Sequence, residues 1–370
     1  MTSEIGRADL VVVGAGIVGL AHAYAALERG LSVAVVERDD RATGASVRNF
    51  GHGCVTAQDG PALDYALAAR ASWLRLAKDS GMWVREAGAV VVARDDDEYA
   101  VLEEFHAIRD DQVVLLDAAG VLARVPVGPD VVGGALLPLD IRVDPREAVH
   151  AIAARLAERG VTFHWGTTVH AIEPGAVATS KGTVRADKIV VAVGHDVDRH
   201  FPGLAEEAAV RRCSLRMLRV ADPHGRAIDP AVLTALSMLR YDAFAACPTL
   251  PALRDRLGGQ RPDLVAMGMN LMFTQAPDGD LIIGDTHHYA RTLDPFDTED
   301  LDNAVLAETA HLLGVPHLTV RQRWRGVYAS APEPFLIATP AEGVRVVSVT
   351  SGIGMTTALG LAPGVLDDLL

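Results

Sequence analysis

A glycine-rich turn close to the N-terminus constrains the fold of this 370-residue chain more than any other feature. Residues 8–13 are mostly β-branched and apolar, which predicts a short buried strand, and the sequence GAGIVG follows at residues 14–19. Residues 20–29 are rich in alanine and predict a helix, and residues 31–36 predict a second buried strand. A G-x-G-x-x-G turn between a strand and a helix, with an acidic residue about 20 positions later, is typical of a dinucleotide-binding βαβ unit. A glycine-rich turn with a purely structural role is the alternative.

The residues of this unit have separate physical roles. Gly14 permits the tight turn, Gly16 lets the backbone approach a pyrophosphate, and Gly19 allows the helix to pack close to the sheet. The helix N-terminus offers free N–H groups and a partial positive charge to the phosphates. Glu37 can accept hydrogen bonds from a ribose hydroxyl and would repel a 2′-phosphate. The neighbouring Arg38 weakens that repulsion, so NADP is disfavoured rather than excluded.

The composition is that of a globular protein, with 49% hydrophobic and 22% charged residues, and the length suits two domains or one large one. The formal net charge of −14 disfavours binding to nucleic acid or to an anionic membrane surface. An anionic substrate would need a local cluster of arginines. We therefore expect a small-molecule site in a monomer or a small homo-oligomer.

Two uncharged stretches, 10–27 and 346–366, have the length of a membrane span. Both contain several glycines and polar residues, so buried segments around a ligand explain them better. The three cysteines form no C-x-x-C pair and no spacing typical of metal ligands. We expect free thiols in a cytoplasmic protein with no membrane span and no bound metal.

The rest of the chain alternates helices and strands around one polar loop at 41–58. Helices are predicted over 61–80, 95–109, 144–160 and 297–314, and at the C-terminus after residue 357. Strands are predicted over 88–94, 161–165, 169–172, 183–193, 211–220, 264–274, 281–284, 321–328 and 343–349.

Two later features favour FAD over NAD. The first is the apolar strand at 183–193, which Gly194 closes far from the first βαβ unit. The second is the sequence SGIGMT at 351–356, where small residues follow a strand and open a helix. A helix N-terminus there would meet the electron-rich edge of a reduced flavin. Together the two features place both chain ends in one nucleotide-binding fold and leave the middle free to build a second domain.

At this point the chain resembles a known family, through the segments SVRNFGHG (46–53), RRCSLRMLR (211–219), GDTHHY (284–289), RWRGVYAS (323–330) and SGIGMT. It is similar to the D-amino acid oxidase/glycine oxidase/sarcosine oxidase superfamily of FAD-dependent amine oxidoreductases, over essentially its whole length. Within that superfamily it is most similar to a bacterial subfamily associated with aminophosphonate utilisation.

The resemblance implies an α/β fold with a Rossmann-like FAD-binding domain and an inserted α+β substrate domain built on an antiparallel sheet. The FAD-binding domain would comprise residues 1–80, 146–204 and 331–370, and the substrate domain 81–145 and 205–330. The implied FAD-binding residues are Gly14, Gly16, Ile17, Val18, Gly19, Glu37, Arg38, Ser46, Arg48, Asn49, Phe50, Gly51, His52, Val169, Gly194, Gly352, Ile353, Gly354, Met355 and Thr356.

The chain departs from the sarcosine-oxidase branch in two ways. Gly326 stands where that branch carries the cysteine that tethers the flavin, so we expect non-covalent FAD. That branch also activates oxygen with a lysine of the substrate domain, whereas this chain has no lysine after Lys188. The sequence therefore leaves open whether oxygen or another molecule is the electron acceptor.

Amine oxidation by a flavin needs a neutral amine whose α-C–H lies over flavin N5, and the protein supplies orientation and electrostatics. His52 and His287 are the catalytic candidates, although either could have a structural role; His288 would face the opposite side from His287. Candidates for substrate contact are Arg48, Arg212, Arg216 and Arg219 for an anionic group, and Tyr289, Trp324 and Tyr328 for the pocket wall, where core packing is the alternative.

These observations predict FAD-dependent oxidation of the C–N bond of a small amine that bears an anionic group, such as an aminophosphonate, an amino acid or an N-substituted glycine. Hydride transfer to flavin N5 would give an imine, which water hydrolyses. The alternatives are a flavoprotein amine dehydrogenase with a non-oxygen acceptor, an NAD-linked Rossmann dehydrogenase, and a flavin-binding module without turnover.

Overall fold

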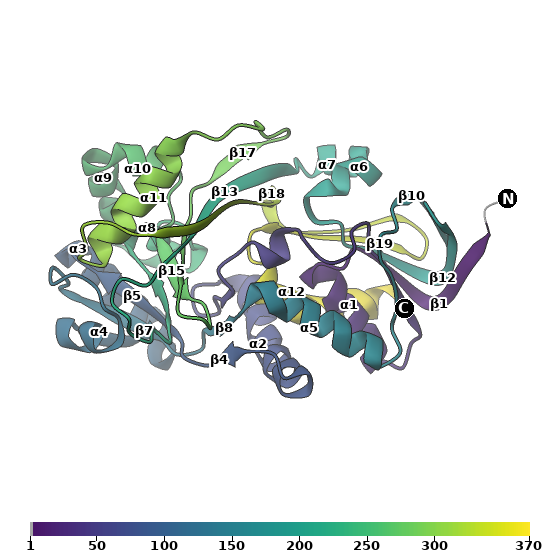
Figure 1. The fold of residues 1–370 in the computed structure, drawn as a ribbon, viewed down its shortest axis with the longest axis horizontal. Coiled ribbons are helices and arrows are strands. Elements are labelled where there is room, and N and C mark those ends of the chain that lie inside the picture. Colours follow the sequence, from purple (N-terminus) through teal and green to yellow (C-terminus); the bar gives the residue numbers. More distant parts are fainter. Residues whose placement is uncertain (1–2) are drawn as a thin grey trace.

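Two sheets of different character share one long strand, β18 (Val320–Ala341), in the computed structural model, which describes residues 3–370. The first part of β18 pairs antiparallel with β13 (Arg211–Val220), and its second part pairs antiparallel with β19 (Val344–Ser351). Figure 1 shows β13 and β18 crossing the middle of the molecule between two halves. The shared strand makes the two sheets one continuous structure.

The half at the right of Figure 1 is built on parallel strands. Their spatial order is β19, β12 (Gly182–Val191), β1 (Glu4–Val13), β2 (Val33–Val36) and β9 (Thr162–His164). β2 and the carboxyl-terminal parts of β1 and β12 are runs of buried apolar residues, because both faces of the sheet are covered there. The carboxyl ends of these strands meet at one edge, which is where open α/β sheets bind ligands.

Helices and a small meander cover the two faces of the parallel sheet. The helices on one face are α1 (Ile17–Glu28), α2 (Gly60–Ser80), α5 (Pro145–Glu158) and α12 (Gly354–Leu369). The other face carries β10 (Val169–Glu173), β11 (Ala176–Thr179), α6 (Val197–His200) and α7 (Pro202–Glu207). Buried Trp73 of α2 donates its indole N–H to the carbonyl oxygen of Met355 at 2.8 Å, which ties α2 to α12.

The other half is a mostly antiparallel sheet with its own apolar core. From β13 outward its strands are β16 (Leu281–Gly284), β15 (Met272–Gln275), β14 (Ala231–Leu233), β5 (Ala89–Ala93), β7 (Gly133–Leu137) and β6 (Val114–Asp117). Its helices are α3 (Asp96–Arg109), α4 (Ala118–Arg124), α8 (Ala235–Met238), α9 (Leu250–Gln260), α10 (Pro262–Ala266) and α11 (Glu299–Leu312). Short strands complete the structure: β3 (His52–Gly53), β4 (Val84–Arg85), β8 (Ile141–Val143) and β17 (His288–Ala290).

The structure confirms the predicted α/β fold class but corrects several elements. Residues 264–274 are not one strand: proline starts α10 at residue 262, Gly268 turns the chain at a φ of +58°, and only Met272 begins β15. The strand predicted over 321–328 continues to Ala341. Because β18 crosses the predicted boundary at residue 330, the division into two discontinuous domains stays a proposal. Within residues 3–370, no helix has the length and apolar character that crossing a bilayer requires.

Candidate functional site

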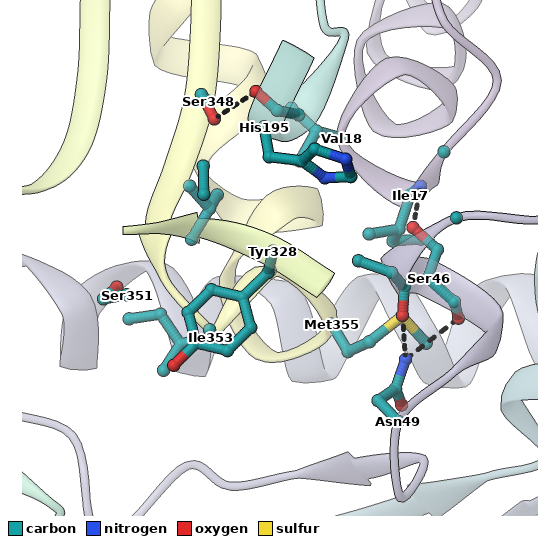
Figure 2. A pocket seen from close by; sticks show the side chains of 18 of the residues that line it. Ile17, Val18, Ser46, Asn49, His195, Tyr328, Ser348, Ser351, Ile353 and Met355 are labelled. Atoms are coloured by element: carbon teal, nitrogen blue, oxygen red, sulfur yellow. Dashed lines mark hydrogen bonds between the residues drawn. The ribbon is translucent and has the colours of Figure 1, made fainter. Parts of the chain in front are cut away.

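A cavity of about 940 Å³ runs along the carboxyl edge of the parallel strands and continues beneath the antiparallel sheet. The parallel half contributes the ends of β1, β2, β12 and β19, and the other half contributes residues such as Arg240, Asp285 and Tyr328. Figure 2 shows side chains from both halves around this space. Its volume is at the upper end of the range for ligand pockets, about 300–1,000 Å³. It therefore suits an extended ligand such as a dinucleotide together with a small substrate.

The glycine turn has the geometry that a dinucleotide needs. Gly14 adopts a φ of +104°, and a Cβ atom there would lie 2.4 Å from the carbonyl oxygen of Ala192. A Cβ atom on Gly19 would lie 1.9 Å from the carbonyl oxygen of Gly14, so the helix can pack this closely only with glycine. Gly16 instead lines the cavity, and a Cβ atom there would meet only the hydroxyl of Ser46. The backbone of Gly16 is thus open to a ligand at the N-terminus of α1.

Glu37 and Ser46 hold the surrounding loops against this turn. Glu37 accepts hydrogen bonds from the backbone N–H of Ala15 at 2.8 Å and of Asp39 at 3.1 Å, and it also lines the cavity. The hydroxyl of Ser46 accepts from the N–H of Ile17 at 2.9 Å, as Figure 2 shows. A carboxylate has further lone pairs, so Glu37 can still accept a ribose hydroxyl.

Arg38 lies beside a buried carboxylate at the same end of the cavity. Arg38 donates to Asp196 at 2.7 Å, and Arg199 and Arg212 donate to the same carboxylate. Burial by itself would raise the pKa of Asp196, but His195 and these three arginines lower it below its ordinary value. Asp196 is therefore charged, and Arg38 shares this one carboxylate with Arg199 and Arg212.

The C-terminal turn closes the cavity against β18. Gly352 has a φ of +80°, and a Cβ atom there would lie 2.9 Å from the ring of Tyr328. Ile353 and Met355 also line the cavity and are drawn with Tyr328 in Figure 2. The N-terminus of α12 follows at Gly354, so its positive end is available to a ligand.

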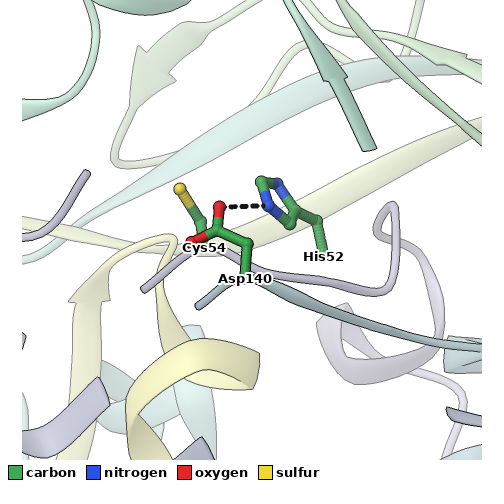
Figure 3. Close-up of side chains that lie close together, drawn as sticks. All are labelled: His52, Cys54 and Asp140. Atoms are coloured by element: carbon green, nitrogen blue, oxygen red, sulfur yellow. Dashed lines mark hydrogen bonds and ion pairs between the residues drawn. The ribbon is translucent and has the colours of Figure 1, made fainter. Parts of the chain in front are cut away.

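His52 is part of a buried pair at the cavity wall (Figure 3). Its Nε2 donates to the carboxylate of Asp140 at 2.8 Å, and Asp140 also accepts the backbone N–H groups of Val55 and Thr56. The other ring nitrogen, Nδ1, is buried and finds no partner among residues 3–370. Cys54 completes a group whose possible ligand atoms lie within 4.8 Å of one another. Three N–H donors already satisfy Asp140, so the arrangement favours a histidine–carboxylate pair over a metal site.

His287 lines the cavity, whereas His288 is exposed. His287 Nδ1 lies 2.8 Å from the carbonyl oxygen of Gly268, so Nδ1 carries the proton and Nε2 is an acceptor. Burial lowers the pKa of His287, although Asp285 opposes that shift. A neutral imidazole therefore presents an acceptor atom at this wall.

Arg240 is the residue of this wall that sequence reasoning missed. Its Nη2 donates to the hydroxyl of Tyr328 at 3.1 Å and to the carbonyl oxygen of Ser351 at 3.3 Å, and its Nε points toward Nε2 of His287 at 3.5 Å. Four arginines line the cavity, and two of them, Arg38 and Arg199, pair with Asp196. Among residues 3–370, no carboxylate lies within ion-pair distance of the other two, Arg48 and Arg240. No motif marks Arg240, which lies in an irregular segment after α8.

The structure brings most predicted site residues to the cavity. Both histidines, Arg48, Tyr328 and all predicted cofactor residues except Gly19 and Gly51 line it. Gly51 has a packing role instead, because a Cβ atom there would lie 2.0 Å from the carbonyl oxygen of Val143.

The other predicted substrate contacts lie outside the cavity lining. Arg212, Arg216 and Arg219 do not line it, and each forms ion pairs with two aspartates. Arg212 pairs with Asp196 and Asp198, and Arg216 pairs with Asp297 and Asp302. Arg219 pairs with Asp278 and Asp280. Trp324 packs under the guanidinium of Arg146, and Tyr289 is exposed beneath that of Arg211.

Known proteins resemble this chain in sequence and in fold. It is 31% identical to one subunit of the opine oxidase of Rhizobium meliloti over 52% of this chain and 58% of that protein. It is 28% identical to glycine oxidase of Bacillus licheniformis over 51% of this chain and 54% of that protein. The chain thus spans less than two thirds of the length of these relatives. The solved glycine oxidase of Geobacillus kaustophilus, 20% identical, superposes over 98% of this chain and 94% of its own with a TM-score of 0.78, which shows a shared fold.

A match to a family model shows the protein family of this chain. Residues 9–363 match the model described as DAO, FAD dependent oxidoreductase. The open backbone at Gly16, the acceptor Glu37 and the two helix N-termini fit that cofactor, and the match sets aside the NAD-linked dehydrogenase that the first βαβ unit left open. The chain belongs to the DAO family of FAD-dependent oxidoreductases.

Proposed function

We propose that this chain oxidises the C–N bond of a small amine that also carries an anionic group, such as an amino acid, an N-substituted glycine or an aminophosphonate. The observation that carries the proposal is Arg240, a cavity arginine with no carboxylate partner within residues 3–370. The names of the relatives, which include glycine oxidase and opine oxidase, agree with a substrate that bears both an amine and an acid.

An anion entering this cavity needs a local positive charge. The chain has a net charge of −14, and desolvating an unpaired anion costs several kcal/mol. Arg240 has its Nη2 fixed by Tyr328 and Ser351, and no acceptor is found for its Nη1 among the described residues. A carboxylate or a phosphonate oxygen would satisfy that donor.

The other residues of the cavity position the reacting groups. Bound FAD would supply the hydride acceptor for the carbon that carries the amine. Tyr328 and Ile353 line the cavity, as Figure 2 shows, and Nε2 of His287 accepts from Nε of Arg240 at 3.5 Å. We propose that Nδ1 of His52 also faces the reacting groups, since it is a buried atom without a partner in the described structure. Held in this enclosure, the substrate loses its freedom to rotate away from the reactive position.

The electron acceptor divides two versions of the proposal. One is an oxidase that uses oxygen, and the other is a dehydrogenase that uses a quinone or a protein carrier. The absence of lysine from residues 189–370 favours the dehydrogenase, because no ammonium from that segment can stabilise superoxide.

Anaerobic bleaching of the flavin tests the substrate class. We expect amino acids, N-methylglycines or aminophosphonates to bleach it and amines without an anionic group, such as isopropylamine, to fail. Arg240→Met should raise the apparent Michaelis constant about 30-fold or more, the effect of losing one member of a desolvated charge pair. Arg254→Met, on the exposed side of α9, is the matched control and should behave like the wild type. Equal bleaching by amines without an anionic group, or unchanged binding by Arg240→Met, would contradict the proposal.

A further inference from the structure

Asp285 and Asn270 form a buried polar pair that no role above explains. Asp285 follows β16 and Asn270 precedes β15, and their backbones exchange two hydrogen bonds of 2.9 Å. Both side chains are buried, and both line the cavity. The amide Nδ2 of Asn270 donates to the carboxylate of Asp285 at 3.2 Å.

The amide oxygen of Asn270 lacks a donor. Its Oδ1 atom is fully buried and has no partner among residues 3–370. With Asp285 ionised, exchanging the amide oxygen and nitrogen would place Oδ1 against its carboxylate, which is repulsive, so the orientation with Nδ2 toward Asp285 is favoured. A buried acceptor without a donor is costly and marks a place where a ligand supplies the hydrogen bond.

The carboxylate of Asp285 also lacks a cationic partner. Nε2 of His287 is 3.9 Å away, but that imidazole is neutral and its Nε2 carries no proton. Arg240 acts on Asp285 only through its field and forms no ion pair with it. Tyr241 and Cys213 also interact with Asp285, and both are uncharged at neutral pH because burial raises the pKa of each. Burial likewise raises the pKa of Asp285 above its ordinary value.

The cavity thus holds a carboxylate without a cation and an arginine without an anion. A ligand with an anionic group and an ammonium group would complete both charges at once. Two acceptors, Asp285 and Oδ1 of Asn270, fit an ammonium with at least two N–H bonds, which means a primary or secondary amine rather than a tertiary one.

We infer that Asp285 and Asn270 bind the ammonium group of the substrate and that Asp285 accepts its proton. In this step one N–H bond of the ammonium breaks, an O–H bond forms on Asp285, and the product pair is a neutral amine and a neutral carboxyl group. No further reactant is needed. The transfer leaves the lone pair on nitrogen that the oxidation of a C–N bond requires. The inference rests on the proposed function, since it takes Arg240 to hold the anion.

Matched inert ligands test this assignment without turnover. 2-Aminoisobutyrate has no α-hydrogen and cannot be oxidised, and pivalate has the same shape with a methyl in place of the amine. The pair (1-amino-1-methylethyl)phosphonate and tert-butylphosphonate makes the same comparison for phosphonates. Titrating the FAD-loaded protein and following the flavin absorption gives a dissociation constant for each. We expect the wild type to bind the amino member of at least one pair about tenfold or more tightly than its partner.

The variants separate the two hypotheses. Asp285→Asn and Asn270→Leu should lose the preference for the amine while they bind the amine-free anion as before. Asp280→Asn, which changes an aspartate outside the cavity, is the matched control and should keep the preference. Flavin content and the thermal midpoint check that each variant folds. With an oxidisable substrate, the rate of anaerobic bleaching by Asp285→Asn should recover as the pH rises toward the pKa of the free amine.

The outcomes are distinguishable. If Asp285→Asn and Asn270→Leu both keep the preference for the amine, the inference is wrong and the proposed function is unaffected. The same holds if the wild type binds both members of each pair equally. Arg240→Met should weaken binding of all four ligands and keep their ratio. If no ligand binds the wild type, or if Arg240→Met binds the anions normally, the proposed function itself is wrong.

Discussion

The imidazole of His52 donates to the buried carboxylate of Asp140 at 2.8 Å, beside the cavity (Figure 3). The same carboxylate holds the backbone N–H groups of Val55 and Thr56, so it fixes both the ring and the chain that follows it. This pairing leaves Nδ1 as the ring nitrogen of His52 that has no partner among residues 3–370.

Glutamine at position 52 separates the two roles of this histidine. In His52→Gln, the amide nitrogen can still donate to Asp140, but the atom equivalent to Nδ1 is lost. We expect normal folding and a rate of anaerobic flavin bleaching lowered about 100-fold or more, the usual scale for a positioned proton-transfer group. Asp140→Asn is the comparison. It replaces a carboxylate that accepts three N–H groups with an amide whose nitrogen is itself a donor, so it should lower the free energy of unfolding by about 1–3 kcal/mol. An unchanged bleaching rate in His52→Gln would leave His52 a purely structural role.

The flavin should be extractable. Gly326 of β18 carries no side chain that could bond to it, and burial raises the pKa of the Cys54 thiol, with Asp140 adding to the shift. A protonated thiol is a poor nucleophile, so a tether through Cys54 is disfavoured. Precipitation with acid should release all of the flavin into the supernatant. A yellow pellet after washing would show a covalent bond.

Oxygen should react slowly with the reduced enzyme. Residues 189–370 contain no lysine, so this part of the chain offers no ammonium to stabilise superoxide. Stopped-flow mixing of the anaerobically reduced enzyme with oxygen measures the rate directly. Fast reoxidation that is insensitive to changes at His52 and His287 would contradict this expectation, whereas a quinone that reoxidises the enzyme faster than oxygen would support the dehydrogenase.

Replacing Arg216 or Arg219 should change the free energy of unfolding by different amounts and should leave substrate binding unchanged. Arg216 makes a bidentate pair with the fully buried Asp302, at 2.8 and 2.9 Å, while Arg219 pairs with aspartates that are partly exposed. Removing one member of a buried pair costs about 3–5 kcal/mol, and an exposed pair contributes about 0–1 kcal/mol. Arg216→Met should approach the lower end of the first range, because Arg323 still contacts Asp302. Urea denaturation measures both variants, and equal stabilities would refute the assignment.

Stability should fall in mild acid because of His22. This histidine is fully buried in α1, donates to the carbonyl oxygen of Val18 at 2.7 Å, and burial lowers its pKa from 6.5 to about 4. The unfolded chain binds the proton first, so the stabilisation is complete above about pH 6.5 and is lost as the pH falls toward 4, on the order of 3 kcal/mol in all. The free energy of unfolding, measured by denaturation at several pH values, should depend less steeply on pH in His22→Leu than in the wild type. The same slope in that variant would assign the pH dependence to other groups.

The local sequence determined the parts of this protein whose contacts lie close along the chain. The turn at 14–19, the acid at its end and the apolar strands follow from spacing and side-chain type, because a βαβ unit closes on itself within about 30 residues. The C-terminal turn at 351–356 was predictable for the same reason, and the resemblance of five segments to one family added the fold and the cofactor.

Only the tertiary structure decided which charges are free. The arginines of β13 were equal candidates in the sequence, yet their aspartates come from segments as distant as α11, and no local pattern shows that pairing. Arg240, Asp285 and Asn270 meet at one cavity although no motif connects them, and Asp285 was visible only as part of the segment GDTHHY. Whether a charge serves the fold or a ligand depends on which opposite charges lie within about 4 Å, and that is set by long-range packing rather than by neighbours in sequence.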